Sequence, residues 1–159
     1  TIEWYPEEGK YYQDGHRKCG VGLEPRKSDG LGGICPVCGR PLTIGVSHRI
    51  LELADRCQPV FAPNSPRVYS LVPLPEVLGE MIGRGPGSKS VLREYARIVS
   101  RFGSELGLLL DAPLDEIGRF QPTLAEAVGR IRDNRVIRTP GYDGKFGVIR
   151  VGVHSGARS

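Results

Sequence analysis

Hydrophobic residues recur at helical spacing between residues 74 and 133, and this pattern predicts a helical region. Its clearest helix starts at Ser88 or Ser90, because serine favours the N-cap position, and it ends before Gly103. The residues expected to face the core of this region are Val77, Leu78, Met81, Ile82, Val91, Leu92, Tyr95, Ile98, Val99, Phe102, Leu124, Ala127, Val128 and Ile131.

Proline and capping residues mark the other helices of this region. Pro75 and Pro113 each suit the first turn of a short helix. Thr123 and Glu126 have the spacing of a capping box, which predicts a further helix, and Asn134 is expected to stop it in the left-handed conformation.

The two flanking regions carry different patterns. Ser47 is expected to cap a helix over residues 48–56 whose apolar face includes Ile50 and Leu51. Beyond it, four prolines in residues 57–73 indicate an extended linker. Near the other end, two β-prone segments flank the sequence PGYDG, which predicts a hairpin with Asp143-Gly144 in its turn.

These patterns predict a small α+β fold, with a zinc-ribbon-like module followed by a helical domain with a C-terminal β-hairpin. We expect a zinc-binding module with a C-terminal helix over residues 1–57 and a Pro-rich linker over 58–73. A helical domain ending in the hairpin is expected over 74–153, and a disordered tail over 154–159.

Composition narrows the class of protein. The 159 residues include 22 glycines and 13 prolines, which favours short elements and many turns. The sequence contains no run of about 18 apolar residues, the length that predicts a membrane span. The N-terminal residues lack the features of a signal peptide. We therefore expect a cytoplasmic protein without membrane contact, and the initial Thr1 suggests a chain cut from a longer one.

The positive charge is unevenly distributed. The formal net charge is +4, and residues 130–159 alone carry seven Lys and Arg against two Asp. A basic segment of this kind is compatible with a phosphate-rich partner, although a solvated cationic face produces the same pattern.

The four cysteines point to a metal site rather than to disulfides. Cys35 and Cys38 form a C-x2-C-G knuckle, and His16 and Cys19 form the same motif with histidine in the first position. Two knuckles supply four ligands to one ion, and thiolates with an imidazole select zinc over magnesium or calcium. We predict one structural Zn²⁺ held by His16, Cys19, Cys35 and Cys38, with no position left for a catalytic water.

Two other residues compete with His16 for the fourth ligand position. His48 follows Cys38 by ten residues at the start of a predicted helix, and Cys57 follows that helix. The spacing alone leaves both alternatives open. We expect no small-molecule cofactor, because the chain has neither a phosphate-binding P-loop motif nor a nucleophile-elbow motif.

Several strings of residues resemble one known family. The segments DGHRKC, CPVCG, HRILELADR, FGSELGLLL, LAEAVGRIR and PGYDGKFGVIRV are similar to the C-terminal half of the endonuclease Q family. The resemblance implies a zinc-binding module and a helical C-terminal domain that follow a PHP catalytic domain, which cleaves DNA at deaminated bases or abasic sites. The H-x-H motif of a PHP domain is absent from these 159 residues.

The resemblance therefore implies that DNA and the missing PHP domain are partners, and that this chain alone is not catalytic. The alternative hypothesis is a freestanding zinc-ribbon module for protein–protein contact, and a small zinc enzyme is the third. The residues predicted to contact DNA are cations beside turns or helix ends, together with one aromatic residue that can stack on a base: Arg17, Lys18, Arg40, Arg49, Arg135, Arg138, Lys145 and Tyr142.

Overall fold

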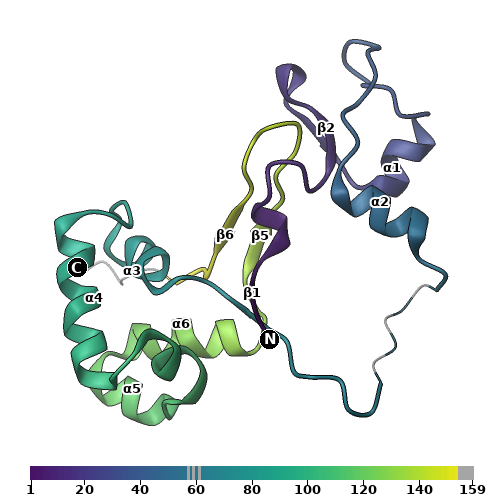
Figure 1. The fold of residues 1–159 in the computed structure, drawn as a ribbon. Helices are drawn as coiled ribbons and strands as arrows, with labels where there is room; N and C mark the ends of the chain where they lie inside the picture. The colour runs from purple at the N-terminus through teal and green to yellow at the C-terminus, as the bar shows by residue number, and fades with distance from the viewer. Residues whose placement is uncertain (57, 59, 61, 154–159) are drawn as a thin grey trace. The chain divides into compact units, whose positions relative to one another are not determined.

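The computed structural model describes residues 1–56, 58, 60 and 62–153, which form two compact units (Figure 1). One unit, called here the helical unit, comprises Thr1–Trp4, Val68–Ile137 and the described residues from Arg150 onward. The other, called the cysteine unit, comprises the described residues of 5–67 together with Arg138–Ile149. The predicted fold class, a small α+β chain with a zinc-ribbon-like module, is confirmed.

The division between the units differs from the expected domain ranges. Residues 138–149 of the hairpin belong to the cysteine unit, whereas the sequence placed them with the helical domain. Hydrogen bonds explain this, because the amides of Gly141 and Gly147 donate to the carbonyls of Glu7 and Glu8 at 2.9 and 3.0 Å. The predicted tail over 154–159 lies outside the described residues.

The helical unit is built around a continuous apolar core. Its helices are α3 (Leu74–Ile82), α4 (Lys89–Phe102), the π-helical turn η3 (Gly107–Asp111), α5 (Leu114–Phe120) and α6 (Pro122–Arg132). The predicted core residues that are buried include Val77, Leu78, Met81, Val91, Ile98, Leu124, Ala127, Val128 and Ile131, whereas Ile82 and Leu92 are exposed. No helix among the described residues is long and apolar enough to cross a membrane.

Helix ends follow the sequence signals only in part. Ser88 caps α4, and its hydroxyl accepts a hydrogen bond from the Val91 amide. Asn134 is left-handed with φ 56°, as predicted. The predicted capping box is wrong, because the N-cap of α6 is Gln121, two residues before Thr123, and the helix begins at Pro122.

A short parallel strand pair corrects the predicted linker. β1 (Ile2–Trp4) pairs with β4 (Tyr69–Leu71), with Glu3 opposite Ser70. The second strand lies inside residues 58–73, where four prolines predicted an extended segment without partners. The prolines lie outside the three paired residues, so the amides needed for pairing are retained.

The cysteine unit contains short elements and few buried apolar side chains. Its elements are η1 (Pro6–Glu8), β2 (Asp14–His16), η2 (Arg17–Cys19), β3 (Val21–Leu23), α1 (Pro25–Gly30) and α2 (Val46–Leu53). Among its described residues, the buried hydrophobic side chains are Tyr5, Cys35, Leu42 and Ile149. Because this core is small, the unit depends for its stability on polar contacts and on interactions among the cysteines.

The C-terminal hairpin is present as predicted. Strands β5 (Ile137–Thr139) and β6 (Val148–Arg150) pair with each other. At the tip, Tyr142 and Lys145 exchange two backbone hydrogen bonds of 2.9 and 2.8 Å around a two-residue turn. Asp143 and Gly144 have φ values of 42° and 83°, which is the backbone of a type I′ turn.

Candidate metal centre and nucleic-acid interface

The first knuckle is a hairpin formed by β2, η2 and β3. His16 is the last residue of β2, opposite Val21 in β3, and Cys19 ends the short helix η2 between them. Gly20 has φ 68°, and its amide donates to the Arg17 carbonyl at 3.1 Å. Glycine adopts this left-handed backbone without steric cost, so the chain can turn directly after the second ligand.

The second knuckle repeats this arrangement at Cys35 and Cys38. The Gly39 amide donates to the Cys35 carbonyl at 2.9 Å, and Gly39 has φ 69°. Gly15, beside His16, exchanges two hydrogen bonds of 2.9 and 2.8 Å with Thr43. The strand that carries His16 is therefore bonded to the segment that follows the second knuckle.

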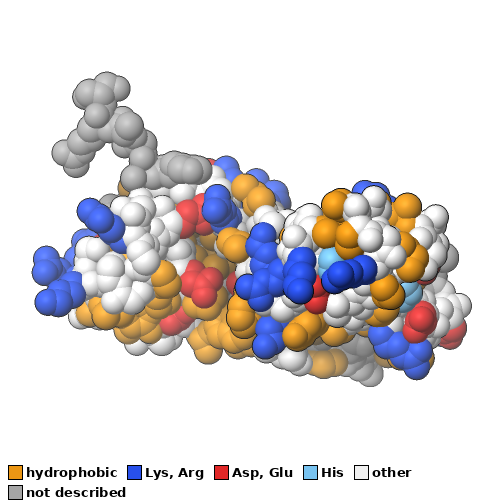
Figure 2. All heavy atoms as spheres, turned by 90° about the horizontal axis from the view of Figure 1, so that it is seen from above, with side chains coloured by type: hydrophobic (Ala, Val, Ile, Leu, Met, Phe, Trp, Pro, Cys, Tyr) orange, Lys and Arg blue, Asp and Glu red, His pale blue; other side chains and the backbone are white. Residues whose placement is uncertain are grey.

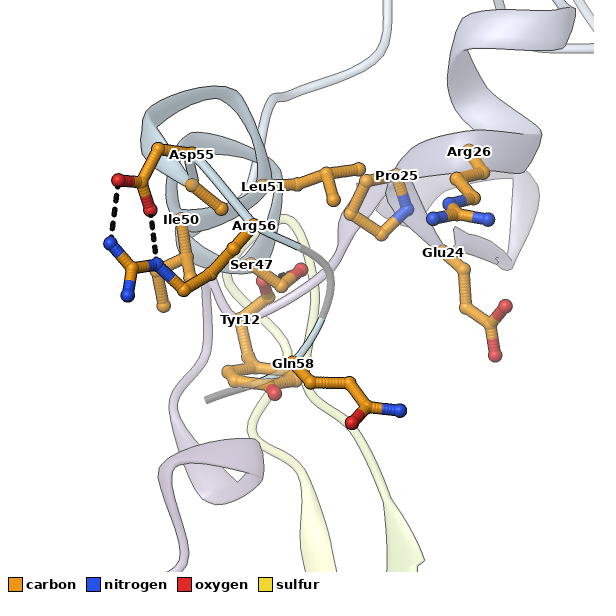
Figure 3. A pocket seen from close by; sticks show the side chains of 11 residues that line it. Tyr12, Glu24, Pro25, Arg26, Ser47, Ile50, Leu51, Asp55, Arg56 and Gln58 are labelled. Carbon is orange, nitrogen blue, oxygen red and sulfur yellow. Dashed lines mark hydrogen bonds and ion pairs between the residues drawn. The ribbon is translucent and has the colours of Figure 1, made fainter. Parts of the chain in front are cut away.

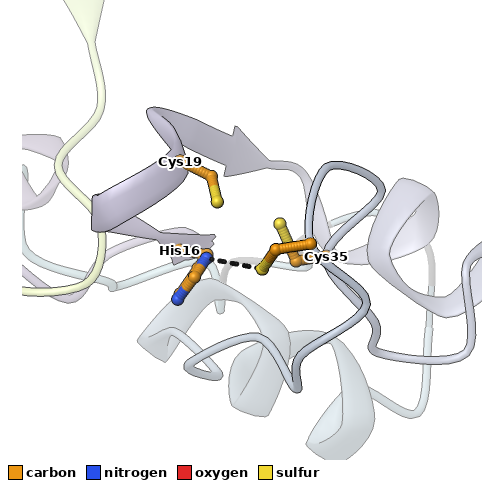
Figure 4. A group of neighbouring side chains, drawn as sticks. His16, Cys19 and Cys35 are labelled. Carbon is orange, nitrogen blue, oxygen red and sulfur yellow. Dashed lines mark hydrogen bonds between the residues drawn. The ribbon is translucent and has the colours of Figure 1, made fainter.

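The four predicted ligands lie together (Figure 4). One donor atom from each of His16, Cys19, Cys35 and Cys38 lies within 4.8 Å of all the others. The Cys38 sulfur is 3.3 Å from His16 Nδ1, and the three thiols form no disulfide. Four soft donor atoms at these separations can bind one metal ion.

The pKa values of two of these thiols diverge. Burial and the neighbouring thiols of Cys38 and Cys35 raise the pKa of Cys19 to about 11. Burial also acts to raise the pKa of Cys35, but the amides of Val37 and Cys38 stabilise its thiolate, so its pKa falls to about 7. A metal ion that binds three thiolates must therefore displace protons from this cluster.

His48, the alternative fourth ligand, has a different partner. It is buried at the start of α2, and its Nδ1 lies 2.6 Å from Oδ2 of the fully buried Asp14. The other oxygen of Asp14 accepts a hydrogen bond from the Gly45 amide at 2.7 Å. This hydrogen bond and burial account for His48 without a metal, and Cys57 lies outside the described residues.

Helix α2 exposes the face that the sequence predicted to be buried. Ser47 does not cap it, because its hydroxyl donates to the Tyr12 carbonyl and Gly45 occupies the N-cap position. Ile50 and Leu51 are 59% and 39% exposed and line an open pocket of about 770 Å³ (Figure 3). The pocket also includes Pro25, Tyr12 and the ion pair of Asp55 with Arg56.

Three of the predicted DNA-contacting cations have protein partners. Arg49 pairs with Glu52 and Arg135 with Asp133, at 2.7 and 2.8 Å. Arg138 lies over the Tyr5 ring at 5.1 Å and 3.6 Å from Glu7. Arg135 and Arg138 belong to the basic C-terminal segment that was expected to contact DNA.

The predicted cations beside the two knuckles are more open. Within the part of the chain that the structure describes, Lys18, Arg40 and Lys145 are exposed and form no ion pair. Arg17 is also exposed, and its charge helps to lower the pKa of Asp143 after the larger effects of hydrogen bonds from the Arg17 amide and Thr43. Figure 2 shows Lys and Arg side chains on either side of a histidine on one face of the molecule.

The ring of Tyr142 is occupied by contacts within the cysteine unit. It lies so close to Gly15 and Gly22 that a Cβ atom at either glycine would come within 3 Å of it. The Lys145 ammonium lies over the same ring at 5.6 Å from its centroid. Tyr142 therefore packs on the first knuckle.

Asp14 and Phe146 were not among the residues expected here, and Asp143 was expected only as a turn residue. Asp14 and Asp143 accept hydrogen bonds from residues far along the chain, so no local motif marks them. Phe146 is 69% exposed in the hairpin. It directly follows Lys145, which is also exposed.

Comparison with known proteins identifies the relatives of this chain. A family model described as the MJ0043 C-terminal domain matches residues 73–135. The protein MJ0043 of Methanocaldococcus jannaschii is 30% identical over 146 residues, which are 91% of this chain. The crystal structure of PfuEndoQ, a lesion-specific endonuclease from Pyrococcus furiosus, is 34% identical and covers 94% of this chain with a TM-score of 0.81.

This chain resembles the C-terminal half of endonuclease Q. A second solved structure, endonuclease Q with a 27-mer duplex that has an abasic lesion at the active site, matches with a TM-score of 0.76 and 34% identity. The chain covers 37% of each of these endonuclease Q chains and 18% of the Methanocaldococcus protein. The resemblance stated from the sequence is confirmed.

Proposed function

We propose that this chain is the zinc-stabilised, DNA-binding C-terminal portion of an endonuclease Q-type DNA repair nuclease. The observation that supports this most is the match over 94% of the chain to a lesion-specific endonuclease at 34% identity. The second matched structure contains duplex DNA with an abasic lesion. The catalytic PHP domain and its action on deaminated bases or abasic sites belong to the rest of the parent protein.

We propose that the metal is zinc and that its role is structural. Three sulfur donors and one imidazole suit zinc better than the oxygen-preferring magnesium and calcium ions. Four protein donors would fill the coordination positions of a structural zinc ion, so none would remain for a catalytic water. The ion would connect two knuckles in a unit whose buried apolar side chains are few.

We propose that DNA contacts are concentrated beside the knuckles. Lys18 and Arg40 flank the ligands Cys19 and Cys38, and their charges are not engaged by carboxylates within the described residues. A basic group that is already paired contributes less to phosphate binding, because the pair must first be separated. We therefore assign Arg49, Arg135 and Arg138 a smaller share of the binding than the sequence implied.

A salt series tests this assignment. The chain is titrated against a fluorescent duplex and its affinity is measured by anisotropy between about 50 and 200 mM salt. Lys18→Gln with Arg40→Gln should weaken binding and reduce the log–log salt slope by about 1.8, since each duplex phosphate contact contributes about 0.9. The matched control, Arg49→Gln with Arg135→Gln, should leave the slope nearly unchanged.

Two results would count against the proposal. If both double variants behave like the wild-type chain, the knuckle cations do not contact phosphate. A wild-type chain without measurable affinity at any salt concentration would exclude DNA binding by this portion. That second result would favour a protein-docking module, which is the alternative function.

One observation favours the protein-docking alternative. Ile50, Leu51 and Leu53 on α2 are exposed, and the first two line the pocket beside Pro25. An apolar helix face next to a pocket is typical of a protein contact. A protein domain corresponding to the unmatched part of the endonuclease Q chain could dock on this face of α2. Protein docking on α2 is therefore compatible with DNA binding at the knuckles.

A further inference from the structure

Two exposed aromatic rings share one lysine beside the tip of the C-terminal hairpin. Phe146 is 69% exposed and Tyr11 is 46% exposed. The ammonium of Lys10 lies 5.6 Å from the centroid of the Tyr11 ring and 5.8 Å from that of the Phe146 ring. We call Lys10, Tyr11, Arg17, Lys145 and Phe146 the Phe146 patch.

Backbone hydrogen bonds join the two segments that carry the rings. The Gly144 amide donates to the Lys10 carbonyl at 2.9 Å, and the Gly147 amide donates to the Glu8 carbonyl at 3.0 Å. These two bonds lie on either side of Phe146 and join the hairpin to the segment that carries Tyr11. A backbone held in this way brings the two rings to the same surface before any ligand arrives, so binding need not order the chain, which lowers its entropic cost.

The Asp143 carboxylate joins the same hairpin to the first knuckle. It accepts hydrogen bonds from the Arg17 amide at 2.6 Å and from the Thr43 hydroxyl at 2.7 Å. A side chain placed at Gly144 would lie 3.7 Å from both the Arg17 guanidinium and the Tyr11 hydroxyl. The metal-binding knuckle therefore supplies one of the cations that flank the rings.

The charge of the patch is positive. Lys10, Arg17 and Lys145 contribute three cations, and the nearby Asp143 carboxylate is already engaged by its two hydrogen-bond donors. Two aromatic faces flanked by cations match the chemistry of a nucleotide, in which an aromatic base adjoins an anionic phosphate.

We propose that the Phe146 patch binds an unpaired nucleotide of single-stranded DNA, with the base stacked on Phe146 and the adjoining phosphates held by Arg17 and Lys145. This inference rests on the proposed DNA-binding function and specifies the form of DNA recognised. In a duplex the faces of each base are covered by its neighbours, so the ring discriminates in favour of unpaired bases. Stacking accepts any base, so the patch does not read sequence.

The experiment compares the affinity of the 159-residue chain for an oligothymidine of about 12 nucleotides with its affinity for a fully paired duplex. Phe146→Leu keeps an apolar side chain but removes the aromatic face, and the exposed position tolerates the change. We expect it to weaken oligothymidine binding by roughly 5- to 100-fold, the range of one lost stacking contact, without changing the salt slope. Its effect on duplex binding should be less than about twofold.

Matched variants separate the contributions of ring, charge and exposure. Phe146→Tyr should retain the wild-type affinity for oligothymidine, because the aromatic face remains. Lys145→Gln should reduce the salt slope for oligothymidine by about 0.7, the value for one phosphate contact with a single strand. Trp4→Leu, which removes an exposed ring from the helical unit, should change nothing.

The outcomes distinguish this inference from the proposed function. If the wild-type chain binds DNA and Phe146→Leu binds oligothymidine equally well, the patch is not a stacking site and DNA binding stands. Equal weakening for single strand and duplex also overturns the inference, since it shows a contact that does not need an unpaired base. If the wild-type chain binds neither DNA, the proposed function fails first.

Discussion

Asp14 and His48 form a buried hydrogen-bonded pair at the start of helix α2. The Asp14 carboxylate accepts hydrogen bonds from the Gly45 amide and from His48 Nδ1, at 2.7 and 2.6 Å. On the other side of the imidazole, Nε2 lies 3.4 Å from Asp29 and 3.8 Å from Glu52. The spacing of His48 from Cys38 made it a possible zinc ligand. The sequence could not exclude this role, because its carboxylate partner lies 34 residues away along the chain.

This environment makes a prediction about pH. The hydrogen bond that His48 donates to Asp14 raises the pKa of His48, although burial acts against it, and the charges of Asp14, Asp29 and Glu52 add to the rise. Because the pKa of His48 is higher in the folded chain than in the unfolded chain, protonation of His48 stabilises the fold. This stabilisation is complete below the unfolded-state pKa of about 6.5, and it is lost as the pH rises through the folded-state pKa. The free energy of unfolding of the cysteine unit should therefore decrease over that interval.

Urea unfolding at a series of pH values measures this dependence, and the NMR titration of the imidazole gives the pKa directly. In His48→Gln the decrease above pH 6.5 should be smaller than in the wild-type chain. An imidazole that titrates at or below about 6.5 in the folded chain would contradict the interpretation.

At the scale of elements, periodicity predicted the helices better than their ends. α4 and α6 lie where apolar spacing placed them, because the burial of a helix face is encoded locally. The π-helical turn η3 was missed, since its carbonyls are bonded by Arg132 from α6, more than twenty residues away. Arg132 donates to the carbonyls of Leu108, Leu109 and Ala112 at 2.6–3.0 Å.

Arg132→Met should destabilise this turn. Hydrogen bonds from a charged donor contribute about 1.5–3 kcal/mol, so we expect the helical unit to lose about 2 kcal/mol of unfolding free energy. Amide hydrogen exchange should accelerate most in residues 107–112. The control Arg119→Met, at an exposed position of α5, should change stability by less than about 0.5 kcal/mol. Equal exchange rates in the two variants would show that Arg132 does not support the turn.

At the scale of the whole molecule, the two units are stabilised differently. The largest fully buried side chains belong to the helical unit, and they include Leu74, Leu78, Ile98, Leu108 and Leu124. The cysteine unit buries few apolar residues and contains the cluster that can bind a metal ion. The cluster of His16, Cys19, Cys35 and Cys38 could be predicted because these residues lie in two local motifs, whereas the hairpin's place in this unit depends on hydrogen bonds between distant residues.

Removal of the metal should therefore affect one unit. Cys35→Ser should abolish zinc binding and unfold the cysteine unit, while the circular dichroism of the helical unit persists. Native mass spectrometry should find one zinc per wild-type chain. Cys57→Ser is the matched control, and it should retain both the zinc and the fold. Loss of zinc in the control instead would restore Cys57 as a ligand.

The parallel pairing of β1 with β4 has a mechanical consequence. Glu3 and Ser70 are paired across this ladder, so the intervening chain, which contains both knuckles, leaves and re-enters the helical unit at neighbouring points. The described residues from Arg150 onward also belong to the helical unit. A pulling force applied to the two ends would therefore load the helical unit first, and the metal-binding knuckles would bear tension only after the strand pair had separated.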